Sequence, residues 1–431
     1  MNEPIQELKN RVFLAGLNTG SSAMEFEHSM EELQELAKAC DMEVIGIFTQ
    51  NLPSPITATY IGSGKINEIK EAVTIHEADA VIFDETLSPI QLRNLADILD
   101  VSILDRTALI LRIFKERART KEAMLQVELA NLQYMLPRLV GLHTALSRQG
   151  GGSGSLSNKG AGETKIELDR RHIEKRITEL KRSLEDVSRE RAITRSSREK
   201  SGIPKVALVG YTNAGKSTLM NWMIDSFEEN PSKKVFEKDM LFATLDTTVR
   251  KISPGNGKPT FLLSDTVGFI NKLPHSLVKA FHSTLEEVTY ADVILQVIDA
   301  SDEHHADHVR VTRETLRELE AETIPCIYVY NKAEKIYPHH KLPFVVGDKI
   351  YLSAKGQIGM DALLTILYEK IFQSQKKCEF LIPLSRGDIL NILFQNAVVS
   401  HYEYRSDGIY CSCICSEKEM KHFAQYCVNV G

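Results

Sequence analysis

One eight-residue stretch limits the possible folds of this chain most strongly. Residues 210–217 read Gly-Tyr-Thr-Asn-Ala-Gly-Lys-Ser and match G-x-x-x-x-G-K-[ST], the phosphate-binding loop. The apolar run Val206–Val209 before it predicts a buried strand, and Thr218–Asn221 after it predict the start of a helix. Strand, loop and helix in this order are the context in which the motif binds phosphate, although a plain glycine turn is the alternative. We therefore expect a parallel α/β domain that binds a nucleoside triphosphate.

The residue types in this loop fit phosphate chemistry. Glycines let backbone N–H groups approach phosphate oxygens, and the helix N-terminus adds partial positive charge. Lys216 is predicted to reach the outer phosphates, and the Ser217 hydroxyl is predicted to ligate Mg²⁺. The predicted nucleotide contacts of this segment are Gly210, Tyr211, Thr212, Asn213, Ala214, Gly215, Lys216, Ser217 and Thr218.

Three further motifs follow predicted strands later in the chain. They are D-T-V-G at 265–268, N-K-A-E at 331–334 and S-A-K at 353–355. The carboxyl ends of parallel strands are where doubly wound sheets place their ligands. Together with the phosphate loop, these motifs resemble those of a Ras-type GTPase domain. Asp265 would hold Mg²⁺ through water, and the Gly268 N–H would sense the γ-phosphate. The predicted contacts are Asp265, Thr266, Val267, Gly268, Asn331, Lys332, Ala333, Glu334, Ser353, Ala354 and Lys355.

Three positions in the motifs need separate interpretation. Glu334 stands where the Ras-type motif has Asp, whose carboxylate accepts hydrogen bonds from guanine. We expect guanine selectivity to survive, because adenine would leave this carboxylate unpaired. Phe269 stands where Ras has a water-positioning glutamine, so intrinsic hydrolysis should be slow and a partner should stimulate it. Asn213 is a candidate K⁺ ligand or a residue that only hydrogen-bonds within its loop, and both interpretations stay open.

The segment Phe-Ala-Thr-Leu-Asp at 242–246 occupies the place of switch I. By resemblance to translation-type GTPases, Thr244 would ligate Mg²⁺ in the triphosphate state, with Thr247 and Thr248 as weaker candidates. The loop would order around the γ-phosphate and relax after hydrolysis. The predicted contacts here are Phe242, Ala243, Thr244, Leu245 and Asp246, and the predicted catalytic residues are Lys216, Thr244 and Gly268.

The remaining sequence predicts a multidomain α/β protein. Strand and helix patterns alternate in 1–106, which predicts an α/β domain with a mainly parallel sheet. Residues 107–200 contain two heptad-spaced segments, Thr120–Leu139 and Ile166–Ala192, which predict an antiparallel coiled-coil hairpin. Its glycine-rich tip at 149–164 is predicted to be a loop that inserts into a partner, with a bland linker as the alternative. We assign 201–372 to the nucleotide-binding, doubly wound Ras-like domain and 373–431 to a small α+β domain.

Other suggestive groups of residues have simpler interpretations. Gly62–Lys65 is not a second phosphate loop, because Thr59 and Ile66 replace required residues. The basic stretch Arg189–Lys200 fits either a solvated helix surface or RNA phosphates. We predict that one strand buries the three alternating cysteines and that solvent covers the clustered histidines. These are Cys411, Cys413 and Cys415, and His304, His305 and His308.

The overall composition limits the partners. A net charge of −6 over 431 residues argues against a general polyanion binder, so any RNA contact must use a local basic patch. The sequence has no apolar run long enough to span a membrane and no signal-peptide pattern. Seven cysteines without framework spacing suit a reducing compartment. We expect a cytoplasmic monomer.

The order of the parts resembles the HflX family of bacterial GTPases over nearly the whole chain. The resemblance rests on Tyr60–Lys65, on Leu-Asp-Arg-Arg at 168–171 and on the 242–246 segment. It implies GTP/GDP and Mg²⁺ as ligands, binding to the large ribosomal subunit and its RNA, ribosome-stimulated hydrolysis, and splitting of stalled ribosomes under stress. The alternatives are an RNA-remodelling NTPase with an ATP-binding N-terminal domain, and a nucleotide-regulated RNA-binding module with little catalysis.

Overall fold

The computed structural model describes residues 10–149, 156–200, 203–227, 242, 248–255, 258–272, 277, 286–371, 376–415, 420 and 422–430. Contacts divide the chain into two compact units. The first unit contains 1–189 together with two short segments from later in the chain, 240–242 and 271–281. The second unit contains 190–239, 243–270 and 282–431.

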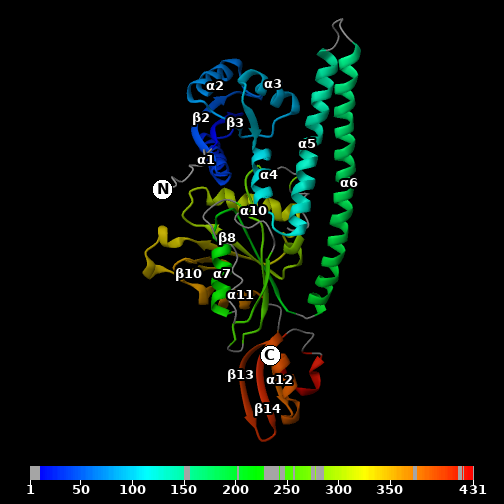
Figure 1. Cartoon of the computed structure of the whole chain (residues 1–431). Helices are drawn as coiled ribbons and strands as arrows, with labels where there is room; N and C mark the ends of the chain where they lie inside the picture. The colour runs from blue at the N-terminus through cyan, green and yellow to red at the C-terminus, as the bar shows by residue number, and fades with distance from the viewer. Residues whose placement is uncertain are drawn as a thin grey trace, which may run out of the picture. The chain divides into compact units, whose positions relative to one another are not determined.

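The first unit begins with a four-stranded sheet in the order β2-β1-β3-β4, and every neighbouring pair is parallel. Helices lie on both sides of this sheet (Figure 1). The predicted parallel α/β architecture is therefore confirmed. The elements are β1 Arg11–Asn18, α1 Ala23–Ala39, β2 Glu43–Asn51, α2 Ser63–His76, β3 Ala80–Phe83, α3 Pro89–Leu99 and β4 Ser102–Asp105.

Helix α4, Arg106–Arg117, was not among the predicted elements. It starts directly after β4, where the Asp105 carboxylate accepts a hydrogen bond from the Ala108 N–H at 2.8 Å and caps the helix. Leu109, Ile110 and Phe114 are buried, so packing stabilises the helix.

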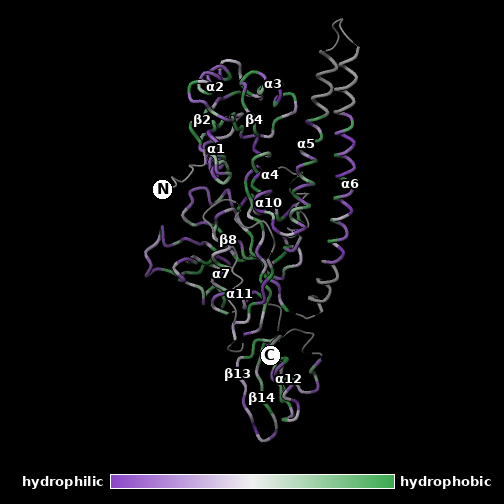
Figure 2. Tube along the Cα trace, viewed as in Figure 1, coloured by the Kyte–Doolittle hydropathy of each residue, from purple (hydrophilic) through white to green (hydrophobic). Residues whose placement is uncertain are grey.

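A long helical hairpin follows, formed by α5 Lys121–Gln149 and α6 Leu156–Lys200. The helices lie side by side in Figure 1, and Arg176 of α6 donates to Glu128 of α5 at 2.7 Å. Leu180 is buried, and Ile173, Ile177, Leu184 and Val187 are half-buried, as the heptad pattern predicts. Figure 2 shows the described part of α6 as mostly hydrophilic, which fits a helix that buries only one stripe.

The prediction that 149–164 is a loop is wrong for most of that range. Gln149 is the last residue of α5, and α6 already begins at Leu156, while 150–155 lie outside the described residues. Extending a formed helix adds one backbone hydrogen bond per residue. That gain outweighs the cost of about 1 kcal/mol for each of Gly160 and Gly162 relative to alanine. The helix α6 therefore continues through Gly160 and Gly162 despite their cost.

The second unit contains a seven-stranded sheet in the order β10-β11-β9-β8-β5-β7-β6. The five central strands are parallel, whereas the edge strands β6 and β10 are antiparallel to their neighbours. This sheet is the mostly parallel, Ras-like sheet that the sequence predicts (Figure 1). Its elements are β5 Lys205–Gly210, α7 Lys216–Phe227, β6 Thr248–Ile252, β7 Phe261–Asp265, β8 Val293–Asp299, α10 His305–Glu318, β9 Cys326–Asn331, β10 Phe344–Val346, β11 Lys349–Tyr351 and α11 Met360–Ile371.

The last sheet is antiparallel, in the order β13-β14-β12-β15, and helix α12 packs against it. Cys411, Cys413 and Cys415 are fully buried on one face of β14, which confirms the predicted strand face. The described residues contain no group of three or more His, Cys, Asp or Glu that could hold a metal ion. No helix in the described ranges is long and apolar enough to cross a membrane. The elements are β12 Lys376–Ile382, α12 Gly387–Asn396, β13 Val398–Arg405, β14 Gly408–Cys415 and β15 Cys427–Val430.

Candidate nucleotide-binding site

The phosphate loop joins β5 to α7, as its sequence predicts. Gly210 and Gly215 have φ angles of +145° and +95°, a region that favours glycine. A Cβ on Gly210 would lie 2.2 Å from the Val297 carbonyl oxygen, and one on Gly215 would lie 2.2 Å from Nδ2 of Asn331. Both positions therefore require glycine. Asn213 is exposed and left-handed, with a φ of +59°.

Lys216 is buried at the start of α7. Its Nζ donates to the carbonyl oxygens of Gly210 at 3.0 Å and of Tyr211 at 2.8 Å. Burial lowers the pKa of Lys216 to about 8, against the opposing effect of the Asp265 carboxylate. The loop carbonyls thus orient the Lys216 ammonium group. Burial destabilises its charged form, and a bound phosphate would stabilise it.

This pKa predicts a pH-dependent affinity for nucleotide. Below about pH 8 the Lys216 side chain is already protonated, so GDP affinity should be flat. Above that value the neutral amine predominates and must take up a proton when phosphate binds. The dissociation constant should therefore rise by up to about tenfold per pH unit. Fluorescence titration of GDP between pH 7 and pH 9.5 measures this. Lys216→Arg, which stays charged, should lack the rise, and an equally flat wild-type profile would contradict the prediction.

Asp265 and Ser217 come together beside the loop. Asp265 is fully buried at the end of β7, and its Oδ2 accepts from the Ser217 hydroxyl at 3.2 Å. A hydroxyl and a carboxylate are oxygen ligands of the kind Mg²⁺ prefers, so these two side chains could hold that ion. The neighbouring Thr266 hydroxyl instead donates to the Leu208 carbonyl oxygen at 2.7 Å, inside the sheet.

The residues after Asp265 are bonded to the phosphate loop. The Phe269 N–H donates to the Gly210 carbonyl at 3.1 Å, and the Thr212 N–H donates to the Phe269 carbonyl at 2.9 Å. A Cβ on Gly268 would lie 2.8 Å from Cγ2 of Thr212 and 3.1 Å from Nζ of Lys216. The Phe269 ring is 2% exposed, so this side chain fills the core. Gly268 is thus adjacent to the lysine predicted to bind the outer phosphates.

Asn331 ties the phosphate loop to the last motif. Its Nδ2 donates to the Ala214 carbonyl at 3.0 Å, and its Oδ1 accepts from the Ala354 N–H at 2.9 Å. Ser353 is buried, and its hydroxyl accepts from the Gly356 N–H at 3.0 Å, which closes the turn. Lys355 is exposed. One buried amide therefore joins the N-K-A-E segment at 331–334 to both the phosphate loop and the S-A-K segment at 353–355.

Two acidic residues flank this amide. Lys332 pairs with Asp299, at the end of β8, at 2.8 Å. Burial raises the pKa of Asp299, but hydrogen bonds from Lys332 and Ser301 outweigh it and hold the pKa below its ordinary value. Oε2 of Glu334 is buried and has no hydrogen-bond partner within the part of the chain that the structure describes. A buried carboxylate oxygen without a donor is costly, and the N–H groups of a guanine base could supply donors.

Switch I falls mostly outside the described residues. Residues 243–247, which include Ala243, Thr244, Leu245, Asp246 and Thr247, are not described, and Thr248 starts β6. Phe242 is described, and its ring packs edge-on against Phe114 of α4 with centroids 4.7 Å apart. This contact belongs to the first unit. The predicted role of Phe242 at the nucleotide stays a prediction.

Sequence reasoning missed two residues near the site. The prediction of a solvated surface is wrong for His308, which is 6% exposed and stacks on Tyr211 with ring centroids 3.7 Å apart. The available signal was the four-residue spacing of His308, Thr312 and Leu316, which share the buried face of α10. The other is Asp299, which could have been found from its place at the carboxyl end of a central strand.

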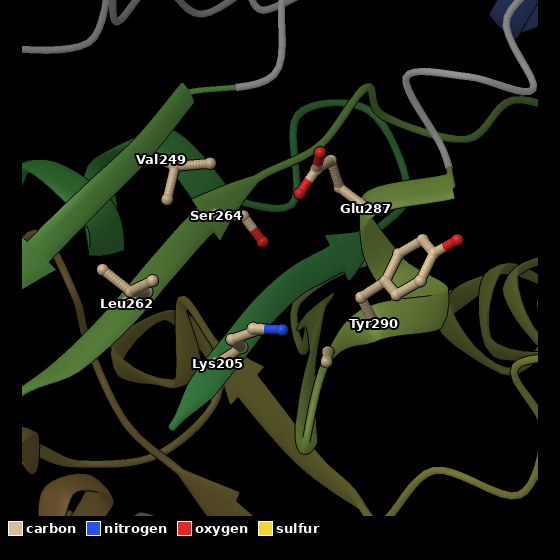
Figure 3. Close-up of a pocket in the computed structure, with 7 residues that line it drawn as sticks. Lys205, Val249, Leu262, Ser264, Glu287 and Tyr290 are labelled. Atoms are coloured by element: carbon tan, nitrogen blue, oxygen red, sulfur yellow. The ribbon is translucent and has the colours of Figure 1, made fainter. Parts of the chain in front are cut away.

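A separate pocket opens on the same sheet (Figure 3). Lys205, Val249, Leu262, Ser264 and Tyr290 are among its lining residues, together with Glu287 of the short helix Glu286–Tyr290. None of them belongs to the four predicted nucleotide motifs. The pocket therefore does not represent the candidate site.

This chain is similar to known GTPases over most of its length. Family models described as "GTP-binding GTPase N-terminal", "GTP-binding GTPase Middle Region" and "50S ribosome-binding GTPase" match residues 27–115, 117–198 and 205–332. A "GTPase HflX" of Caldanaerobacter subterraneus subsp. tengcongensis is 44% identical over 94% of this chain and 91% of its own length. The "GTPase HflX" of Escherichia coli K12 is 38% identical over 89% of each chain. A crystal structure of a GTP-binding protein from Sulfolobus solfataricus with GDP matches 84% of this chain and 99% of that one, at 26% identity and a TM-score of 0.43.

Proposed function

Because the chain belongs to the HflX family of GTPases, we propose that this GTP-hydrolysing enzyme acts on the large ribosomal subunit and splits or rescues stalled ribosomes under stress. The observation that best supports a nucleotide-controlled function is the convergence of four separate motifs on one edge of the sheet. Hydrogen bonds from Asn331, Phe269 and Thr212 join those motifs to the phosphate loop. A structural change at the γ-phosphate can therefore be transmitted to all four motifs.

The proposed site uses the residues in distinct ways. Lys216 binds the outer phosphates, and Gly268 senses the γ-phosphate. Ser217 and Thr244 would be the direct ligands of Mg²⁺, and Asp265 would hold the ion through water. When bound, this ion neutralises charge on the phosphates. Asn213 remains a candidate ligand for K⁺, which would supply further positive charge.

A partner that stimulates hydrolysis is expected because position 269 has no side chain that can orient the attacking water. Phe269 has no polar atom in its side chain and its ring is buried, so it cannot orient a water molecule for attack. We expect slow hydrolysis by the free protein and stimulation by a partner. The 50S ribosome-binding description of the matched model favours the large ribosomal subunit as that partner. The hairpin α5–α6, with its basic end at Arg189–Lys200, would provide contacts to ribosomal RNA.

Steady-state GTP turnover with and without purified large subunits tests this function. We expect stimulation of at least about tenfold, because a partner that completes a GTPase site can supply much larger factors. Light scattering of intact ribosomes mixed with the protein and GTP should report subunit dissociation, and Lys216→Ala should abolish both signals. Turnover unchanged by large subunits, together with no co-sedimentation, would contradict the proposal.

A further inference from the structure

The first unit includes a segment that the sequence assigns to the GTPase domain. Asn271 and Lys272 follow Gly268 by only three and four residues, yet they group with 1–189. Leu277, farther along this segment, is 1% exposed. The chain that leaves the γ-phosphate-sensing motif is therefore held by residues of the N-terminal part.

The residues that hold it form a buried ionic cluster. Asp84 follows β3, Arg106 begins α4 and Glu32 lies on α1, and each of the three is nearly inaccessible to solvent. Arg106 donates to Oδ1 of Asp84 at 2.7 Å and pairs with Glu32. Oδ2 of Asp84 also accepts from the Ser29 hydroxyl at 2.7 Å. We call Glu32, Asp84, Glu85 and Arg106 the anchor cluster.

Asn271 and Lys272, the first two residues of the segment 271–281, both contact the anchor cluster. The Lys272 Nζ lies 2.6 Å from Oδ2 of Asp84 and 2.7 Å from Oε1 of Glu85. The Asn271 backbone carbonyl accepts from Arg106 at 3.3 Å, and its N–H donates to Glu32 at 3.4 Å. Side-chain and backbone contacts therefore fix the same two residues.

These contacts lie at the point of the sheet where open α/β folds usually bind ligands. In the order β2-β1-β3-β4 the connections diverge between β1 and β3, and open α/β sheets bind ligands outside the strand ends at such a point. Asp84 is the first residue after β3. In this chain, that position receives Lys272 of the same polypeptide.

The charge of the anchor cluster favours a cationic side chain at the position of Lys272. The anchor cluster has three carboxylates and one guanidinium, so it carries an excess of negative charge that an additional cation can offset. The Lys272 side chain is about one-third exposed, so solvent screens part of the attraction. Asp84 itself is fully buried, which makes the loss of a cation there costly.

We propose that Lys272 is a positioning residue for GTP hydrolysis. Phe269 is fixed by its two backbone hydrogen bonds around the phosphate loop, and Asn271 and Lys272 are fixed by the anchor cluster. Only Ile270 lies between these anchored residues. The backbone that carries Gly268 is thereby held ready for the γ-phosphate, which GDP lacks. This role concerns hydrolysis by the free protein and goes beyond the proposed action on ribosomes.

Lys272→Met tests the proposal, because it removes the charge and keeps most of the aliphatic side chain. Without ribosomes, we expect kcat to fall about tenfold, as for a small misplacement of a catalytic group. KM for GTP and the affinity for GDP should stay within about twofold, because GDP does not use Gly268. Lys272→Arg should restore most of kcat. The matched control is Lys38→Met, which removes a lysine whose ion pair with Glu35 lies on the surface.

Several results would overturn the proposal. One is a kcat for Lys272→Met within twofold of wild type, and another is the same loss in Lys38→Met. Parallel losses in kcat and GDP affinity, or no rescue by arginine, would show a general structural defect instead. Thermal melting of each full-length variant tells whether the anchor cluster still folds. Because the assay omits ribosomes, its failure leaves the proposed ribosomal function untouched.

Discussion

Lys216→Ala is expected to reduce GTP turnover by about 100- to 1000-fold, the usual effect of deleting one preorganised charge donor from an active site. The loop carbonyls of Gly210 and Tyr211 hold its ammonium group, and the Asp265 carboxylate supports its charge. Alanine can supply neither the charge nor the reach. Nucleotide affinity should fall as well, since the predicted contact is made to the outer phosphates in both GTP and GDP.

Phosphate-release assays at saturating GTP measure this effect. Lys251→Ala is the matched control, because Lys251 is an exposed lysine on β6 of the same sheet. Its turnover should equal that of the wild type. Melting temperatures of the two variants show whether either substitution unfolds the domain. A Lys216→Ala protein that is folded and retains more than one-tenth of wild-type turnover would refute the assignment of this loop.

Glu334→Ala is expected to weaken GDP binding by about 100-fold, since it removes an acceptor for two base donors, and hydrogen bonds to a charged group contribute about 1.5–3 kcal/mol each. Its Oε2 has no hydrogen-bond partner in the described part of the chain, so the carboxylate is available for the base. ADP affinity should change little, because adenine cannot use this acceptor. The preference for guanine over adenine should then largely disappear.

Competitive titration with GDP and ADP measures this preference. Lys335→Ala, one residue along and exposed, is the control and should keep wild-type affinities. Glu334→Asp, with one methylene less and the same charge, should remain selective for guanine. If Glu334→Ala loses GDP and ADP affinity equally, this residue supports the loop and does not read the base.

Parts of the fold were predictable because a local pattern decided them. The buried strand before Gly210 and the alternating cysteines of β14 each follow from hydrophobic spacing alone. The heptads of α6 likewise predicted its stripe of buried and half-buried residues around Leu180. The extent of α6 was not predictable in this way, because glycine content suggested a loop where helix propagation continued to Leu156.

The site was predictable to a similar degree. Each motif is a short residue pattern that can be recognised in the sequence. The hydrogen bond from Asn331 to Ala214, in contrast, depends on distant segments meeting at one edge of the sheet. The prediction for His308 was wrong because the start of α10 is mostly polar, while the stacking of His308 on Tyr211 depends on a distant segment. The Lys272 contact with Asp84 joins residues separated by 188 positions, and no periodicity reports such a pairing.

A structure of the full chain with Mg²⁺ and a non-hydrolysable GTP analogue tests the central claim most directly. We predict that the backbone N–H groups of 210–217 bind the phosphates, that the Lys216 Nζ contacts the outer phosphates and that the base lies against the Glu334 carboxylate. A nucleotide bound elsewhere, or one in this loop with its base turned away from Glu334, would contradict this claim.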